Sequence, residues 1–448
     1  MIKRKKIIVF CISTLLFFIY GCVVKEENNS YHEDESIIDS TLEENVDHNS
    51  SPDDIILTMW SYYSDGWDNI IEQFESIHDG ITIELETISY GNYPQEYFKS
   101  FVEGNTPDIV VIDSPHIGDF KAVEGLENLL YEPYEARIYE NDFSESLWDT
   151  GKSLDGNQLI GIPYVTAPFV AFYRADIMEQ YGYPADPEKL AVFMEDPANW
   201  LEMVSELAKD NIWMVQWPME VLRIYESGTG MFDNSLNFQR NNESFLEAID
   251  LAQTIHKNSL YSSKDIWSPV GQEAIKNDQY AMLYLGTWGT GLLNEWVPEQ
   301  AGKWRMTRLP FNVYGWMNSS ILSIPEASEN KDLAWEFIKF SSFELPMEGF
   351  QSMTMGYLPS RNNPKIIDYE SEFLGGQREQ ELIEKLMAQT KEHTLTPLDI
   401  RANEIWYEKM YGMLEWGYDA DEILVSIEET LDMTLGQERE ILLRHISQ

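Results

Sequence analysis

The sequence predicts an α/β fold that begins with a parallel sheet. Between residues 55 and 113, short apolar runs alternate with segments whose apolar residues recur at helical spacing, in the order strand, helix, strand, helix, strand. This order is typical of parallel strands joined by helical crossovers. The chain has 448 residues, of which 43% are hydrophobic. That is enough for two or three folding units, or for one large two-lobed protein.

The N-terminus is expected to be an export signal. Residues 3–6 are basic, and the apolar run 7–20 that follows has 14 residues, fewer than the roughly 20 that a membrane span needs. It ends in Gly21-Cys22, which resembles the lipobox of bacterial lipoproteins, where a small residue precedes a cysteine that becomes lipidated. We expect residues 1–21 to be a lipoprotein signal peptide and Cys22 to be the lipid anchor. An ordinary signal with a chance cysteine and an uncleaved anchor are the alternatives.

An acidic segment, residues 22–54, follows the signal. It contains 11 acidic residues and one lysine and has little apolar clustering, so burial cannot offset its chain entropy. We predict a flexible tether. The whole chain has 77 acidic and 31 basic residues, so most of the acidic excess belongs to the folded part. This charge disfavours nucleic-acid binding and adhesion to anionic lipid. We interpret it as an adaptation to a salty or alkaline exterior.

The elements of the first folded segment are expected in close succession. Apolar or alternating residues predict strands over 55–60 and 81–85, and a fully apolar run predicts a buried strand over 109–112. Helical spacing predicts helices over 67–78 and 93–101. Ligands of open α/β sheets bind beyond the carboxyl ends of the strands. Trp60 and Asp113 both stand at such ends.

Further motifs, taken in order, resemble one known family. Residues 106–110 place Pro-Asp before a hydrophobic strand, and 286–288 form a glycine-x-tryptophan turn after a predicted strand over 281–285. The remaining matches are segments 159–164 and 172–176 (a strand pair that crosses between lobes), 309–310, 321–324, 330–337 and 356–361. Together they resemble the sugar-binding extracellular solute-binding proteins of ABC importers, related to maltose-binding protein. Arg174 and Gly315-Trp316 depart from the usual residues of that family.

This resemblance implies a periplasmic-binding-protein-like fold, in which crossing hinge strands join two α/β lobes and a ligand cleft lies between them. Residues 55–165 and 318–344 would form the N-terminal lobe. Residues 166–317 and 345–448 would form the C-terminal lobe, with a last amphipathic helix over 421–435. Closure of the lobes would then signal that ligand is bound.

The resemblance also implies a function. The protein would be lipid-anchored through Cys22 on the extracellular face of a bacterial cell membrane, and would deliver a sugar or oligosaccharide to an ABC transporter permease. We expect a monomer without catalysis of its own. Three alternatives stay open: a binding protein for a cationic ligand such as a polyamine, a secreted carbohydrate-active enzyme, and a surface lipoprotein without a role in transport.

Aromatic residues are the leading candidates for ligand contact. The chain has 14 Trp and 24 Tyr, whose flat faces suit the C–H face of a sugar, while carboxylates can accept bonds from its hydroxyls. The candidates at loops and strand ends are Trp60, Asp65, Asp113, Tyr164, Trp217, Trp288 and Trp316. Each has a structural alternative: a lone Trp often packs in a core, Asp113 could cap a helix, and Asp65 could belong to an ordinary turn. Trp335, at helical apolar spacing, is expected in the core.

Signatures of catalysis and of metal binding are missing from the sequence. Its seven histidines form no HExxH pair, and it contains no GxSxG elbow, phosphate loop or EF-hand pattern. Its two cysteines, Cys11 and Cys22, exclude a disulfide scaffold and a cysteine-rich metal site. A glycosidase pair is defined by the separation of two carboxyl groups in space, which counting does not test. The sequence therefore predicts no enzyme, no cofactor and no metal.

Overall fold

The computed structural model describes residues 55–345 and 354–446. The predicted signal peptide, the lipid anchor Cys22 and the acidic tether lie outside the described residues. In the described part of the chain, no helix has both the length and the hydropathy of a membrane span.

The first five elements form in the predicted order, and a short helix follows them. The six are β1 (Ile55–Ser61), α1 (Trp67–Ile77), β2 (Ile81–Thr87), α2 (Tyr93–Glu103), β3 (Ile109–Asp113) and α3 (Ser114–Phe120). β1 lies between β2 and β3 and pairs with both in parallel. The predicted parallel sheet with helical crossovers is therefore confirmed.

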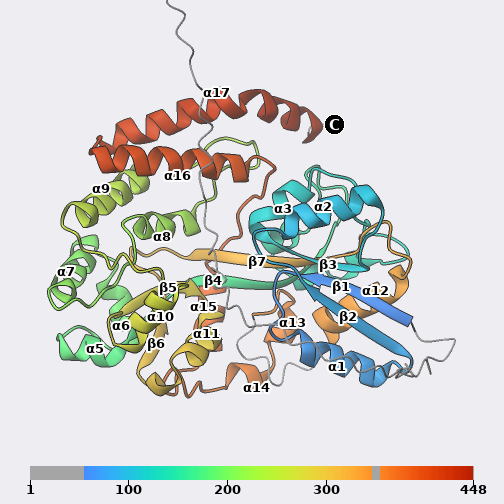
Figure 1. The fold of residues 1–448 in the computed structure, drawn as a ribbon, viewed down its shortest axis with the longest axis horizontal. Helices are drawn as coiled ribbons and strands as arrows, with labels where there is room; N and C mark the ends of the chain where they lie inside the picture. The colour runs from blue at the N-terminus through green and yellow to red at the C-terminus, as the bar shows by residue number, and fades with distance from the viewer. Residues whose placement is uncertain (1–54, 346–353, 447–448) are drawn as a thin grey trace, which may run out of the picture. The chain divides into compact units, whose positions relative to one another are not determined.

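Two long strands continue this sheet into the rest of the molecule. β7 (Gly315–Ser323) pairs antiparallel with β3 and with β4 (Ile162–Arg174). β4 pairs in turn with β5 (Met282–Gly286) and β6 (Trp304–Thr307), both antiparallel. Figure 1 shows β4 and β7 running between the helices that include α1 and α2 and those that include α7 and α9.

The strand pair predicted over 159–164 and 172–176 is wrong, because β4 is one continuous strand of 13 residues. Its middle residues stay paired with β7 across two irregularities, at Pro163/Val165 and at Ala167/Pro168, instead of turning away. Pro168 has no N–H to donate to a sheet, and such residues are tolerated at bulges.

Helices cover the sheet on both sides (Figure 1). The remaining helical elements are η1 (Ala136–Asp142), α4 (Glu145–Thr150), α5 (Ala175–Gln180), α6 (Pro187–Phe193), α7 (Pro197–Ala208), α8 (Glu220–Gly228), α9 (Glu243–Lys257), α10 (Pro269–Lys276), α11 (Gly289–Trp296), η2 (Pro298–Gln300), α12 (Lys331–Lys339), η3 (Phe340–Glu344), α13 (Leu358–Arg361), α14 (Pro364–Ile367), α15 (Glu379–Met387), α16 (Asp399–Trp416) and α17 (Ala420–Ile446). The predicted last helix is confirmed within α17, which packs beside α16.

Buried side chains gather at the two ends of the sheet. Leu57 of β1, Ile109 of β3 and Trp335 of α12 belong to what we call the first core. Tyr173 of β4 and Leu283 of β5 belong to the second core, which packs on the two faces of the other end. Two hydrophobic cores joined by paired strands make two α/β lobes.

The expected lobe boundaries are a proposal. The packing of the described residues after residue 344 differs from them. Leu345, Met355 and Ile366 pack in the first core, although the expected boundary assigns 345–448 to the C-terminal lobe. The chain therefore still contributes to the first core at the short helix α14, and the next buried hydrophobic residues, Phe373 and Leu374, belong to the second core.

Trp335 lies in the first core, as predicted, with 6% of its surface exposed and its ring edge-on to Tyr134. We expect Trp335→Ala to lower the free energy of unfolding by about 3–5 kcal/mol, because it removes a buried aromatic side chain and leaves a cavity. Trp416 is 83% exposed, so Trp416→Ala is the matched control and should change it by less than about 0.5 kcal/mol. Urea unfolding followed by circular dichroism measures both, and equal losses would contradict the burial.

Candidate functional site

A carboxyl group, an amide and an indole from three different elements meet where the two lobes join. Asp113 ends β3, Asn318 lies in the crossing strand β7, and Trp288 immediately precedes α11. The indole Nε1 of Trp288 donates a hydrogen bond to Oδ1 of Asn318 (3.3 Å), whose Nδ2 donates to Oδ1 of Asp113 (3.2 Å). Since β3 contributes to the first core and Trp288 packs on the second, these two bonds connect the lobes.

Tyrosines surround the carboxyl group of Asp113. The hydroxyl of Tyr90 donates to its Oδ2 (2.9 Å), and the backbone N–H of Ser114 donates to its Oδ1 (3.0 Å). The second bond caps α3, so the structural alternative for Asp113 also holds. Tyr62 stacks on Tyr93 at 5.2 Å between ring centroids, and its hydroxyl lies 2.6 Å from Oγ of Ser320 in β7. We call Tyr62, Tyr90, Asp113, Trp288 and Asn318 the inner cluster.

The protonation of the inner cluster follows from its burial. Asp113 is only 3% exposed, and burial raises the pKa of its carboxyl group to about 6 despite the donors around it. Burial, and after it the charge of Asp113, also raises the pKa of Tyr62 and of Tyr93 well above that of a free tyrosine. Near neutral pH the cluster thus presents neutral phenols and an amide around one carboxyl group.

Gly286 and Gly289 flank Trp288 in the turn between β5 and α11. β5 ends at Gly286, as the predicted turn requires, and α11 begins at Gly289. A methyl group at Gly286 would collide with the indole nitrogen of Trp288, and one at Gly289 would come within 2.6 Å of the ring of Phe172. The absence of a side chain at Gly286 therefore leaves room for the indole beside the end of β5, and its absence at Gly289 lets α11 begin against Phe172 and Leu285.

The inner cluster remains open to solvent in part. Tyr90 is 47% exposed although its hydroxyl bonds to Asp113, and Tyr62, Trp288 and Asn318 are half-buried. A ligand can therefore reach aromatic faces and polar edges of the same cluster.

Of the seven predicted site residues, the structure brings Asp113 and Trp288 together. Two others lie on the first lobe close to strand β1. Trp60 packs against the ring of Tyr97, 5.9 Å away, and its carbonyl accepts from the Tyr97 hydroxyl (2.9 Å). Asp65 is exposed in the loop after β1. Burial raises the pKa of the nearby Tyr63 hydroxyl most, and the charges of Asp113 and then Asp65 raise it further.

The remaining three predicted residues have other surroundings. Tyr164 is fully buried in the first core and stacks on Trp67 at 5.1 Å. Trp316 is buried on β7 and lies edge-on to His393 at 5.2 Å. Trp217 is half-buried in the loop before α8, where its carbonyl accepts from the N–H of Glu220 (3.0 Å).

Tyr62, Tyr90 and Asn318 were not among the residues predicted from the sequence. The strand-end rule that selected Trp60 could have found the two tyrosines, because both follow the carboxyl ends of β1 and β2 closely. Asn318 lies inside a strand, and only the pairing of β7 with β3 and β4 brings its amide between Asp113 and Trp288.

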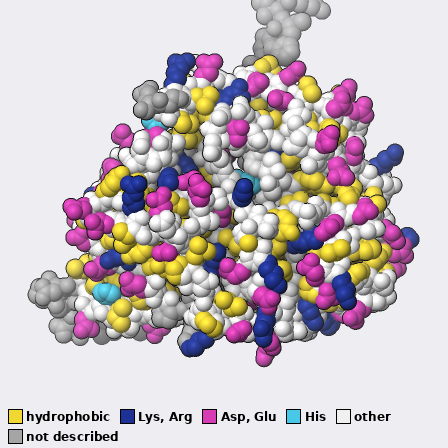
Figure 2. Space-filling view, turned by 180° about the vertical axis from the view of Figure 1, so that it is seen from behind, with side chains coloured by type: hydrophobic (Ala, Val, Ile, Leu, Met, Phe, Trp, Pro, Cys, Tyr) yellow, Lys and Arg dark blue, Asp and Glu magenta, His cyan; other side chains and the backbone are white. Residues whose placement is uncertain are grey.

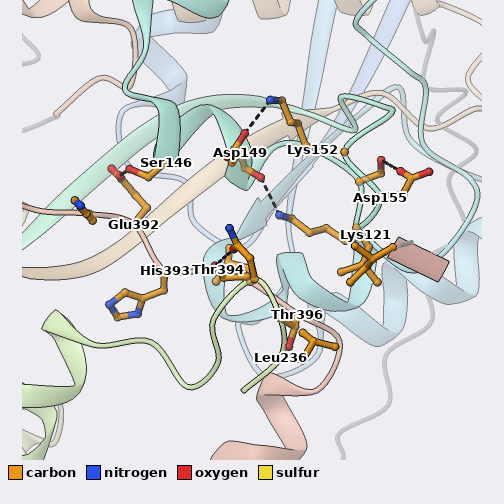
Figure 3. Close-up of a pocket in the computed structure, with 17 residues that line it drawn as sticks. Lys121, Ser146, Asp149, Lys152, Asp155, Leu236, Glu392, His393, Thr394 and Thr396 are labelled. Carbon is orange, nitrogen blue, oxygen red and sulfur yellow. Dashed lines mark hydrogen bonds and ion pairs between the residues drawn. The ribbon is translucent and has the colours of Figure 1, made fainter. Parts of the chain in front are cut away.

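Two cavities are lined by residues that do not belong to the inner cluster. The first, of about 470 Å³, is shown in Figure 3, and the second has about 630 Å³. Lys121 Nζ donates to the carbonyl of Asp149 (2.8 Å), Lys152 pairs with the carboxylate of Asp149 (2.8 Å), and Ser146 donates to Glu392 (2.5 Å). The lining of the first cavity contains three lysines and three acidic residues, so its formal charges balance. Neither lining includes Asp113, Asn318 or Trp288.

The described residues also contain no group of side chains that could bind a metal ion. Among residues 55–345 and 354–446, no cluster of three or more His, Cys, Asp or Glu side chains is arranged to hold an ion. On the face shown in Figure 2, Lys and Arg side chains are interspersed with acidic and hydrophobic ones.

Two α/β lobes joined by crossing strands, with polar and aromatic groups where they meet, define a two-lobed binding protein of the periplasmic type. The chain belongs to the bacterial extracellular solute-binding protein family, whose model matches residues 60–342. The resemblance found in the sequence motifs is therefore confirmed.

Individual relatives agree with this assignment. The lactose-binding protein of Rhizobium radiobacter is 25% identical over 330 residues, which are 68% of this chain and 75% of that protein. The transporter-associated binding protein of B. animalis subsp. lactis, solved with β-1,6-galactobiose, is 15% identical, with a TM-score of 0.70 over 86% of this chain and 98% of its own. The sugar-binding protein MalE of Xanthomonas citri is 17% identical, with a TM-score of 0.67 over 86% and 99%. These structures confirm the predicted fold class.

Asp113 should make stability depend on pH in a defined direction. Its folded pKa of about 6 lies above the ordinary value of 3.8, so the folded state holds more protons between these values. Protonation of Asp113 therefore adds to the free energy of unfolding. This contribution is fully present below pH 3.8 and is lost as the pH rises through about 6. Relative to Asp113→Asn, the wild type should lose up to about 3 kcal/mol of unfolding free energy across this window.

Chemical denaturation at half-unit pH steps measures this difference. Asp419→Asn, at an exposed position of the loop before α17, is the matched control. Parallel pH profiles for the wild type and Asp113→Asn would contradict the raised pKa.

Proposed function

We propose that this protein is a substrate-binding protein that captures a sugar or oligosaccharide between its lobes and delivers it to an ABC permease. The observation that carries this proposal is the hydrogen-bonded series Trp288, Asn318 and Asp113, which joins an aromatic face to polar groups at the junction of the lobes.

The chemistry of the inner cluster suits a sugar. Each pyranose ring has a weakly apolar C–H face and a rim of hydroxyls, so it needs a flat apolar surface beside donors and acceptors. Trp288 offers the surface, while Asn318, Tyr90 and Asp113 offer amide, phenol and carboxyl groups. A site built to pair hydroxyls rejects analogues that lack them, because its own polar groups would lose their partners.

Lobe closure supplies the signal to the permease. Trp288 and Asp113 belong to different lobes, and the joining strands β4 and β7 are positioned to act as the hinge. A ligand that contacts both residues interacts more favourably with the closed state than with the open one. It therefore shifts the population toward closure.

The relatives indicate which sugars to try first. One is named for binding lactose, another was solved with β-1,6-galactobiose, and a third, from Bifidobacterium longum, with lacto-N-biose. These are disaccharides that contain galactose, so galactosides are our leading candidates.

The polyamine and enzyme alternatives find less support at the inner cluster. A polyamine carries several positive charges, whereas the hydrogen bonds of the inner cluster involve a single carboxyl group, which already accepts three of them. Glycosidases act with two carboxyl groups that flank the scissile bond. We therefore propose binding without catalysis.

We place the protein on the extracellular face of the bacterial membrane as a monomer. Lipidation of Cys22 would anchor it, and the acidic segment 22–54 would hold the lobes away from the bilayer.

Binding should be visible as a thermal shift. We expect lactose or β-1,6-galactobiose to raise the melting temperature by mass action, and spermidine to leave it unchanged at equal ionic strength. Trp288→Ala should weaken galactoside binding at least about tenfold, because it removes the stacking face. Isothermal titration calorimetry measures the affinity, with Trp416→Ala as the control. A shift with spermidine and with no saccharide would favour the polyamine alternative instead.

Lipidation is tested by metabolic labelling with a radioactive fatty acid. The wild type should incorporate label and Cys22→Ala should not, because the acylated side chain is removed. Cys11→Ala is the matched control, since it removes the other cysteine and leaves Gly21-Cys22 intact. Equal labelling of the wild type and Cys22→Ala would refute the lipid anchor.

A further inference from the structure

An aromatic surface continues outward from Trp288. The ring of Trp267 lies 6.1 Å from that of Trp288 between centroids, at an interplanar angle of 42°. Trp296, at the end of α11, lies 5.4 Å from Trp267 and nearly perpendicular to it. Three indoles, two at the ends of α11 and one in the loop before α10, thus lie next to one another on the second lobe.

The ring of Trp267 is not packed inside a hydrophobic core. It is 55% exposed, whereas Trp200, Trp304 and Trp406 are completely buried. A side chain stabilises the fold by leaving water, and Trp267 leaves much of its ring in water. Val270, in the first turn of α10, is 64% exposed as well.

The backbone around Trp267 is nevertheless held firmly. Its own N–H donates to Oδ1 of Asp265 (3.1 Å), and the N–H of Ile266 donates to Oε1 of Gln216 (3.0 Å). Ser268 caps α10 through its hydroxyl, which accepts from the N–H of Gly271 (3.2 Å). The exposed indole is therefore attached to an ordered backbone, so stacking of a ligand on it needs no ordering of the loop.

We propose that Trp267 and Trp296 form an outer sugar subsite next to Trp288. The natural ligand is then an oligosaccharide whose chain extends from the inner cluster past Trp288 to Trp267. This inference rests on the proposed function and specifies the ligand class of the same site. One sugar ring occupies the inner cluster, and the next ring stacks on Trp267.

The two subsites differ in selectivity. The inner cluster has several polar groups that can pair with hydroxyls at defined positions. Indole offers a flat face and a single N–H donor, so stacking on Trp267 tolerates changes in which hydroxyls the outer ring carries. The protein therefore selects the inner sugar strictly and accepts varied outer sugars.

Calorimetry with galactose, β-1,6-galactobiose and β-1,6-galactotriose tests this subsite on the full folded protein. The wild type should bind the trisaccharide more tightly than galactose. Trp267→Ala should weaken trisaccharide binding at least about tenfold and leave galactose binding within about twofold, because only the outer ring loses its contact. Trp267→Phe keeps a flat face and should retain most of the affinity. Trp416→Ala, an exposed indole at the end of α16, is the matched control.

Each other outcome has a definite meaning. Unchanged trisaccharide affinity in Trp267→Ala overturns the outer subsite and leaves the proposed function standing; the exposed indole would then face a permease instead. Equal losses for galactose and the trisaccharide also overturn it, since Trp267 would then act by supporting Trp288. If the wild type binds no saccharide at all, the proposed function fails and the subsite fails with it.

Discussion

The antiparallel pairing of β4 with β7 is the interaction on which the rest of the structure depends. The pairing runs from Ile162 opposite Leu322 to Phe169 opposite Gly315. Each strand joins the first core at one end and the second core at the other, so the backbone hydrogen bonds of this pair hold the lobes in one sheet. The same register places Asn318 between Asp113 and Trp288. A shift by one residue would turn that amide to the opposite face and separate the carboxyl group from the indole.

The residues of the inner cluster also support the fold around them. Asp113 caps α3 while it accepts from Tyr90 and Asn318, and its burial makes its carboxyl group less acidic. Trp288 packs on the second core and reaches Asn318 because Gly286 leaves room for its indole. Although the chain has 77 acidic residues, a single carboxyl group enters the inner cluster. The acidic surface and the ligand chemistry are thus separate properties of this protein.

Local patterns predicted much of the fold and part of the site. Helical spacing identified α1 and α2, and the apolar run before Asp113 identified β3, because the buried face of an element imposes its own period on the sequence. Trp335 was placed in the core by the same argument. The strand pair over 159–176 was mispredicted, because the pairing of β4 with β7 passes through a proline bulge that a local pattern does not reveal. Tyr164 and Trp316, selected by composition and position, are buried, and an aromatic residue near a strand end has the same local sequence whether its ring faces solvent or core.

The sequence by itself determined the order of strands and helices, the family, and the turn that presents Trp288, since these depend on neighbouring residues and on the spacing of motifs. Tertiary structure alone decided which polar groups meet. Asp113, Asn318 and Trp288 are separated by up to 205 residues along the chain, and strand pairing brings them within hydrogen-bond distance. It also decided that Trp267 stands exposed beside Trp288, because side-chain exposure depends on every element that packs around a residue.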